Sequence, residues 1–193
     1  MEGCPQGDFK PLLPWKGKPL ARALIDTCLD AGLKAIVVTG WRGGELARAL
    51  GTAPGLSYAA NPEWQEGLAG SLLAGARAAS EPSAGARGFF VAHADMPLIP
   101  RRAFELIIEQ EGRRKENGAE PITLFPASEG RTGHPVWIPF SALPGLKALG
   151  RGAKVRDFLL QGPWAPVELG PGQDGIFFDI DSAEEYERAC RPI

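Results

Sequence analysis

The sequence predicts a three-layer α/β domain built on a mixed, mostly parallel sheet. From residue 18 onward, segments with the apolar spacing of helices alternate with short runs of β-branched and aromatic residues, as in a parallel sheet covered by helices. In the second half, two short β segments are separated by a loop of hairpin length, which adds antiparallel strands. The length of 193 residues suits one domain, and we expect it to span residues 1–193.

The first half of the chain alternates helices and strands. The segment 18–32 places Leu20 and Leu24 on one helical stripe, and Gly32 suits a left-handed stop just beyond it. The run KAIVVTG (34–40) predicts a strand that is buried on both faces. The other elements expected in this half are a helix over 41–51, a strand over 56–62, a helix over 67–79, a strand over 87–95 and a helix over 100–114.

The second half is richer in β structure. PITLFPA (121–127) and HPVWIP (134–139) predict two short strands. Ser182 and Glu185 have the spacing of a capping box, which predicts the start of the last helix. The elements expected between them are a helix over 152–161 and strands over 164–170 and 175–181.

Composition and charge exclude several classes of protein. An apolar fraction of 44% and a net charge of -2 give no general attraction to nucleic acid or to an anionic membrane. Cys4, Cys28 and Cys190 lie far apart and form no Cys-x-x-Cys pair, so neither a disulfide framework nor a zinc site is indicated. No export signal or membrane-length apolar run is found, which predicts a cytoplasmic protein with a small-molecule ligand.

Carboxylates follow two of the expected strands. Asp95 ends the apolar run GFFVAHAD, and Asp179 and Asp181 end GIFFDID. Ligands of open α/β sheets bind at the carboxyl ends of strands, and carboxylates from two such ends can hold Mg²⁺ against a phosphate chain. The alternative is structural, with Asp95 as a turn or helix cap and Asp181 as part of the start of the last helix.

Six motifs together resemble one known family. They are GDFKPLLPWKGKPL, NPEWQEGLAGSLLAG, ADMPLI, GRTGHPVWIP, GAKVRDFL and DIDSAEEY. In this order they resemble the molybdenum cofactor nucleotidyltransferases, above all the cytidylyltransferase branch. The resemblance implies a Rossmann-like nucleotidyltransferase fold that uses Mg²⁺ to couple CTP or GTP to a phosphorylated, molybdopterin-like acceptor, with release of pyrophosphate. It also implies a possible contact with a molybdoenzyme or a chaperone.

The resemblance also implies roles for single residues. Lys10 would act in catalysis by contacting the triphosphate, Asp95 would be a catalytic metal ligand, with Asp181 or Asp179 beside it, and His134 would meet the acceptor. The residues that would lie against the nucleotide are Asn61, Gly67, Ser71 and Gly75. Structural alternatives remain open: a solvated lysine, a structural histidine, and glycines that serve close helix packing.

The start of the chain departs from the family pattern. Members open with a buried strand and a loop of the form L-A-A-G-x-S-x-R-M-G, whose amides and arginine hold the triphosphate. Here six residues precede Gly7, and the first arginine is Arg22. We therefore expect one of two outcomes. Upstream residues supply the strand, or the strands at 34–40 and 87–95 pair directly while residues 1–6 cover their carboxyl ends.

Two other functions compete with the transferase. A non-catalytic relative could keep the fold and bind nucleotide or cofactor through a degenerate phosphate loop. A sugar-phosphate nucleotidyltransferase would use the same fold, but GHPV and NPEWQEGLAGSL favour the molybdenum cofactor family.

Overall fold

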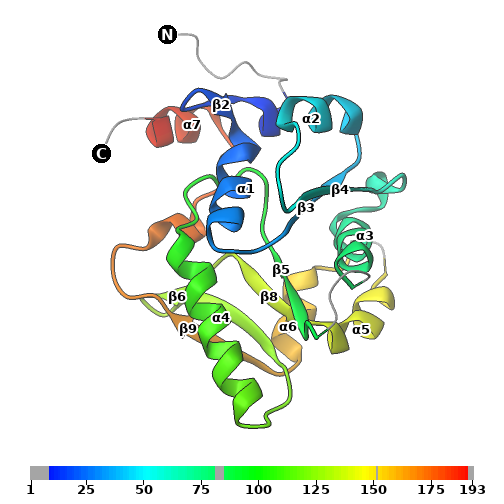
Figure 1. Cartoon of the computed structure of the whole chain (residues 1–193), viewed down its shortest axis with the longest axis vertical. Coiled ribbons are helices and arrows are strands. Elements are labelled where there is room, and N and C mark those ends of the chain that lie inside the picture. The colour runs from blue at the N-terminus through cyan, green and yellow to red at the C-terminus, as the bar shows by residue number, and fades with distance from the viewer. Residues whose placement is uncertain (1–8, 81–84, 151, 191–193) are drawn as a thin grey trace.

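The computed structural model describes residues 9–80, 85–150 and 152–190 (Figure 1). Its first half contains short 3₁₀ turns and the following elements: β1 (Pro14–Trp15), β2 (Lys18–Pro19), α1 (Leu20–Asp30), β3 (Ala35–Thr39), α2 (Gly43–Leu50), β4 (Leu56–Ala60) and α3 (Leu68–Ser80). Gly32 follows α1 with φ of 76°, as its position in the sequence predicts. Within the described ranges, no helix is both long and apolar enough to cross a membrane.

The second half supplies most of the sheet. Its elements are β5 (Gly88–Val91), α4 (Arg101–Glu116), β6 (Thr123–Ser128), β7 (Arg131–Thr132), β8 (Val136–Pro139), α5 (Leu143–Lys147), α6 (Val155–Gln161), β9 (Trp164–Glu168) and α7 (Ala183–Cys190). The capping box is confirmed, because the Ser182 amide donates to Glu185 Oε2 at 2.8 Å and the Glu185 amide donates to Ser182 Oγ at 3.2 Å.

The described strands pair both in parallel and antiparallel, as the sequence predicts, but they fall into three separate ladders, of which one joins only β1 and β2. β3 pairs with β4 in parallel, with Ala35 opposite Leu56. A second ladder has the order β5-β8-β6-β7, and β9 pairs in parallel with β6. β8 runs antiparallel to both β5 and β6, which is the antiparallel excursion expected from the hairpin.

Direct pairing of the strands at 34–40 and 87–95, one of the two expected outcomes, is not found among the described residues. β3 and β5 belong to separate ladders, which we call the upper ladder (β3–β4) and the lower ladder (β5 to β9). The prediction that β3 is buried on both faces is wrong, since only Ala35 is buried and the next four residues are partly exposed. A strand without a neighbour on one side leaves part of its surface open to solvent. Residues 1–6, which we expected over these strand ends, lie outside the described residues.

The predicted strand over 175–181 is wrong as well. The segment forms a 3₁₀ turn (Asp174–Phe177) and then an irregular stretch. The apolar residues of this segment still pack into the core, because Ile176 and Ile180 are fully buried. Its backbone bonds to two separate loops instead of to one neighbouring strand.

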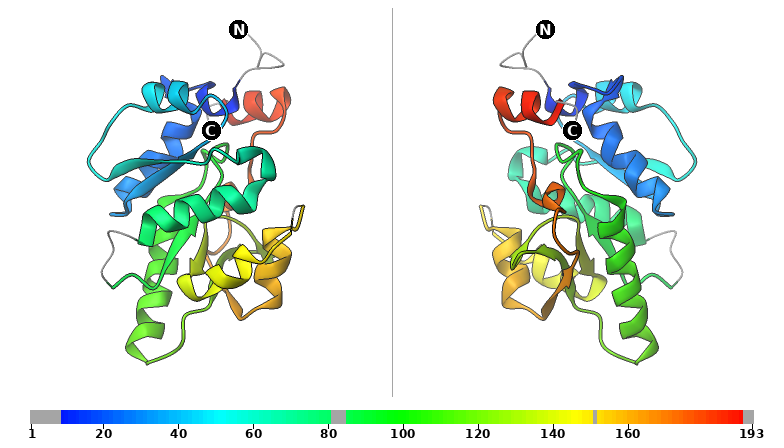
Figure 2. Two further views of the ribbon diagram at one scale, coloured as in Figure 1. Left: turned by 90° about the vertical axis from the view of Figure 1, so that its right-hand side faces the viewer. Right: turned by 90° about the vertical axis from the view of Figure 1, so that its left-hand side faces the viewer.

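Helices cover both faces of the lower ladder, which gives the three layers (Figures 1 and 2). On one face, Leu72 of α3, Leu146 of α5 and Leu159 of α6 pack against Phe125 and Ile138 of the sheet. On the other face, the core residues are Phe104 and Ile107 of α4 with Phe90, Leu124 and Trp137 of the sheet. This packing fixes the ends of β5, β6 and β8, where the candidate site lies.

Candidate functional site

Backbone hydrogen bonds bring three loops together at one edge of the lower ladder. The loops are residues 92–98 after β5, the hairpin loop 129–135, and the segment 174–181. The His134 amide donates to the Ile176 carbonyl at 2.9 Å, and the Ile180 amide donates to the Asp95 carbonyl at 3.0 Å. The polar side chains on these loops are therefore held in a fixed arrangement.

Asp95 lies in a turn four residues beyond the end of β5, and its side chain is half-buried. Burial is the main cause that raises the pKa of its carboxyl group above the usual value, and the nearby Lys10 acts in the opposite direction. Since the ionised carboxylate is poorly solvated here, an arriving cation gains more from Asp95 than from an exposed carboxylate.

Lys10 and Asp181 form an ion pair at the same edge, with 2.6 Å between Nζ and Oδ1. This hydrogen bond raises the pKa of Lys10 and lowers the pKa of Asp181. Asp179 contacts Asp181 and also acts on the lysine, as does Asp95. The structure thus brings Lys10, Asp95, Asp179 and Asp181 together, although they are up to 171 positions apart.

These carboxylates do not form a complete metal cage. Among the described residues, no three histidine, cysteine or acidic side chains are arranged closely enough to hold a metal ion. Mg²⁺ is commonly held by one or two carboxylates together with substrate phosphates, so a full cage is not required. The hard oxygens of Asp95 and Asp181 are donors of the right kind for such a shared site.

His134 lies beside His93 on the neighbouring part of this edge. Its Nδ1 is 3.3 Å from the Val91 carbonyl oxygen, and its ring meets the ring of His93 edge-on, with centroids 4.6 Å apart. Burial, followed by the nearby His93, lowers the pKa of His134 to about 4. His134 is therefore neutral at pH 7 and can exchange hydrogen bonds without carrying charge.

His93 is a residue of this edge that we did not single out from the sequence. The signal was available, because His93 lies two residues before Asp95 in HADMPLI. The contact with His134 could not be anticipated, since it depends on how the hairpin loop folds back over β5.

Two arginines hold the hairpin loop next to the site. The Arg156 guanidinium donates to the Thr132 carbonyl at 3.2 Å and also to the Thr132 hydroxyl. Arg131 lies over the Phe177 ring, 4.2 Å from its centroid, and so connects the hairpin to the 3₁₀ turn. Of these two cations, Arg156 lies near enough to His134 to act on its pKa.

The segment expected to lie against the nucleotide follows β4. Asn61 is buried; its amide nitrogen donates to Ser71 Oγ at 3.0 Å and its oxygen accepts from the Glu63 amide at 3.1 Å. Gly67 is exposed with φ of 112°, a conformation that favours glycine. Gly75 has a packing role, because a Cβ there would come within 2.9 Å of Val38 Cγ2.

Comparison with known proteins agrees with this architecture. The sequence model of the family described as "MobA-like NTP transferase domain" matches residues 3–166. The molybdenum cofactor cytidylyltransferase of Escherichia coli is 27% identical over 93% of this chain and 86% of its own length. The nicotine blue oxidoreductase of Paenarthrobacter nicotinovorans is 24% identical over the same shares of the two chains.

A solved structure shows the same fold. The Mycobacterium tuberculosis protein Rv0371c, crystallised as a complex with manganese, superposes with a TM-score of 0.69. The match covers 95% of this chain and 92% of the mycobacterial chain, at 19% sequence identity.

Proposed function

Since the chain belongs to the MobA-like NTP transferase family and is an enzyme of the nucleotidyltransferase class, we propose that it transfers CMP or GMP from the NTP to a phosphorylated acceptor. The acceptor is of the molybdopterin type, and pyrophosphate is released. The observation that carries the proposal is the meeting of Lys10, Asp95 and Asp181 at one edge of the sheet, with His93 between these groups and His134.

The bond changes of the reaction need no covalent intermediate on the protein. An oxygen of the acceptor phosphate forms a bond to the α-phosphorus of the nucleotide, and the bond from that phosphorus to the bridging oxygen breaks. The electron pair of the broken bond leaves with pyrophosphate. In such transfers, positioning and charge neutralisation supply most of the acceleration.

Lys10 supplies a positive charge to this site. In the free protein its ammonium group is held by Asp181, with 43% of the lysine side chain exposed, so an incoming phosphate can compete for it. An ammonium group acts as a point charge and tolerates several phosphate orientations. We infer that Lys10 neutralises the triphosphate while the α-phosphorus is attacked.

Divalent metal binding is the role that we propose for Asp95, with Asp181 or Asp179 as its partner. A bound Mg²⁺ would supply charge neutralisation at the phosphates. The half-buried carboxylate of Asp95 gains most from such an ion, and the exchange of Lys10 from Asp181 to a phosphate would leave Asp181 available. The manganese complex of the mycobacterial protein of the same fold supports the use of a divalent metal.

His134 is proposed to meet the acceptor. Because its pKa is about 4, the ring stays neutral and adds no charge to the phosphates. Its backbone bond to Ile176 and its ring contact with His93 fix its orientation. A neutral, oriented imidazole suits a heterocyclic acceptor that is recognised by hydrogen bonds.

The base is proposed to be cytosine. The motif likeness to the cytidylyltransferase branch and the 27% identity to the Escherichia coli cytidylyltransferase support CTP over GTP. The likeness to an enzyme named as an oxidoreductase shows that similar sequences can carry other activities, so turnover has to be measured directly.

The test is release of pyrophosphate from CTP, GTP, ATP and UTP, with Mg²⁺ or Mn²⁺ and molybdopterin-type acceptor. We expect acceptor-dependent release that is fastest with CTP. Binding of CTP without turnover under any of these conditions would favour the non-catalytic relative. Transfer to a sugar phosphate at a higher rate would favour the third function.

A further inference from the structure

Exposed aromatic rings gather at the carboxyl ends of the upper ladder. Trp41 follows β3 and is 53% exposed, and Trp64 follows β4 and is 39% exposed. We call Phe9, Trp41 and Trp64 the aromatic shelf. Tryptophans that serve the core of this protein are far more buried: Trp15 is 3% exposed and Trp137 is 6% exposed. The exposure of Trp41 and Trp64 is therefore not explained by core packing, whereas Phe9 also packs against the core beside the upper ladder.

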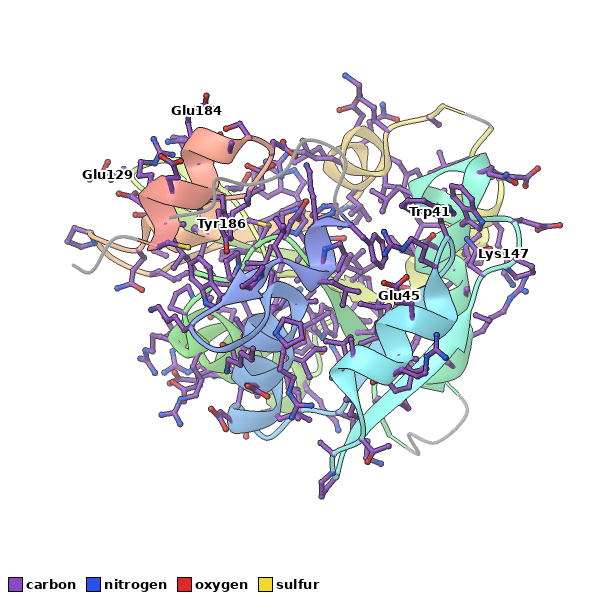
Figure 3. The ribbon with its side chains drawn as sticks, turned by 90° about the horizontal axis from the view of Figure 1, so that it is seen from above. Trp41, Glu45, Glu129, Lys147, Glu184 and Tyr186 are labelled. Carbon is purple, nitrogen blue, oxygen red and sulfur yellow. The ribbon has the colours of Figure 1, made fainter. Side chains whose placement is uncertain are left out.

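The shelf is assembled by specific contacts. A Cβ on Gly40 would come within 2.6 Å of Trp64 Cβ, so the glycine lets the tryptophan stand directly against the end of β3. The rings of Phe9 and Trp41 meet edge-on, with centroids 5.6 Å apart. The Arg42 guanidinium lies over both rings, at 5.1 and 5.3 Å from their centroids, while also binding Glu45. Figure 3 shows Trp41 and Glu45 from above.

The shelf is continuous with the charged part of the site. Phe9 directly precedes Lys10, whose ammonium group lies 2.6 Å from Asp181. On the other side, the buried Asn61 bonds to the Glu63 amide and to Ser71, and so anchors the loop that carries Trp64. The aromatic rings are thus connected to the lysine and the carboxylates through the neighbouring residues Phe9 and Lys10.

We propose that Trp41 and Trp64 stack against the nucleobase of the NTP. The proposal rests on the proposed function, because it uses Lys10 as the phosphate contact. With the triphosphate at Lys10, the shelf that begins at the adjacent Phe9 is the surface on which the base would lie. Every base has a π face, so stacking here supplies affinity without choosing between cytosine and guanine. The choice of base must then come from hydrogen bonds made elsewhere.

The test compares binding of CTP and of inorganic tripolyphosphate, in Mg²⁺, by calorimetry. The variants are Trp41→Ala, Trp64→Ala and Trp64→Phe. Trp164→Ala is the matched control, because Trp164 is 40% exposed but lies on β9, with its ring edge-on to Phe125. Thermal unfolding of each variant verifies that the fold is kept.

We expect the alanine variants to raise the Kd for CTP by about 5- to 100-fold, as loss of one base stack does. Trp64→Phe should recover most of the affinity. Binding of tripolyphosphate should not change, and Trp164→Ala should bind CTP like the wild type. The same pattern with GTP would confirm that the shelf does not discriminate between bases.

Three results would overturn the proposal. Wild-type affinity for CTP in Trp41→Ala and Trp64→Ala would remove the shelf from nucleotide binding. Equal weakening of CTP and tripolyphosphate would assign the effect to the phosphate site. A higher KM for the acceptor with CTP binding unchanged would assign the shelf to the acceptor ring. Failure of the wild type to bind any NTP would instead refute the proposed function.

Discussion

The upper ladder and the two central strands of the lower ladder, β6 and β8, differ greatly in how well they are shielded from solvent. All six residues of β6 and all four of β8 are buried. In the upper ladder only one of the five residues of β3 is buried, and none of the five in β4. The centre of the lower ladder is therefore the stable scaffold. The strands of the upper ladder have fewer buried residues, as is usual for regions that open easily.

The candidate site draws on both parts. Trp41 and Trp64 follow strands of the upper ladder, whereas Asp95 and His134 follow strands of the lower ladder. A nucleotide bound across them would connect the two ladders. Since a ligand that binds only the folded state stabilises it in proportion to RT ln(1 + [L]/Kd), nucleotide should protect the upper ladder most.

The largest effect is expected from matched leucine truncations in the two ladders. Leu124 of β6 is 0% exposed, and Leu46 of α2, which packs on the upper ladder, is 5% exposed. We expect Leu124→Ala to lower the free energy of unfolding by about 4 kcal/mol and Leu46→Ala by about 2 kcal/mol, measured by urea denaturation. An equal or larger loss for Leu46→Ala would contradict the proposed difference between the ladders.

The next largest effect is expected at Asp95, where a substitution should change activity without lowering stability. Asp95→Asn should lower kcat by at least about 100-fold, because it removes the proposed metal ligand. Burial raises the pKa of Asp95 in the folded state, so the ionised form destabilises the fold as pH rises through that pKa. Neutralising it should therefore leave Tm unchanged or slightly higher at pH 7. Tm is measured by thermal unfolding.

Asp30→Asn is the control, because Asp30 is an exposed carboxylate at the end of α1. It should keep full activity. A fall of several degrees in Tm for Asp95→Asn, with nucleotide turnover kept, would make Asp95 a structural cap.

How far the sequence predicts the structure also differs between the two parts. Local signals were sufficient to predict the helices. The apolar stripe of Leu20 and Leu24 and the Ser182–Glu185 capping box each depend on residues only a few positions apart in the sequence. The prediction failed for β3, which reads as a buried strand but lies in a separate ladder. The burial of a strand depends on which strands and helices pack beside it, and the sequence of the strand alone does not specify those neighbours.

The site was predictable in its residues but not in its contacts. Strand ends and motifs pointed to Asp95, His134 and Asp181. The segment GIFFDID was predicted to be a strand, yet Ile176 and Ile180 are buried without strand pairing. The ion pair of Lys10 with Asp181 joins residues 171 positions apart, a contact that no local pattern specifies.

A smaller effect is expected from the protonation of His134. Its pKa is about 4 in the folded protein and about 6.5 in the unfolded chain, so the unfolded chain takes up the proton first as pH falls. The stability contributed by the neutral ring is complete above pH 6.5 and is lost between about pH 6.5 and 4, at no more than about 1.4 kcal/mol per pH unit. His134→Gln should reduce this loss, as measured by Tm from pH 7.5 to pH 4.5. Identical pH profiles for both proteins would refute the buried, neutral state.

The smallest effect on stability is expected at Lys10, although the residue joins the shelf to the carboxylates. The Lys10–Asp181 pair is partly exposed, with 43% and 64% of the two side chains open to solvent, so screening keeps its contribution below about 1 kcal/mol. The raised pKa of Lys10 and the lowered pKa of Asp181 keep both groups charged from pH 6 to pH 9, so Lys10→Met should show no pH-dependent stability change there.

The same variant should raise the Kd for CTP by about 5-fold, or about 1 kcal/mol, and this increase should shrink in high salt. Lys34→Met, a lysine between α1 and β3, is the control for loss of a positive charge. Equal CTP affinities in Lys10→Met and Lys34→Met would return Lys10 to the role of a solvated surface lysine, and the shelf would then lose its link to the phosphates.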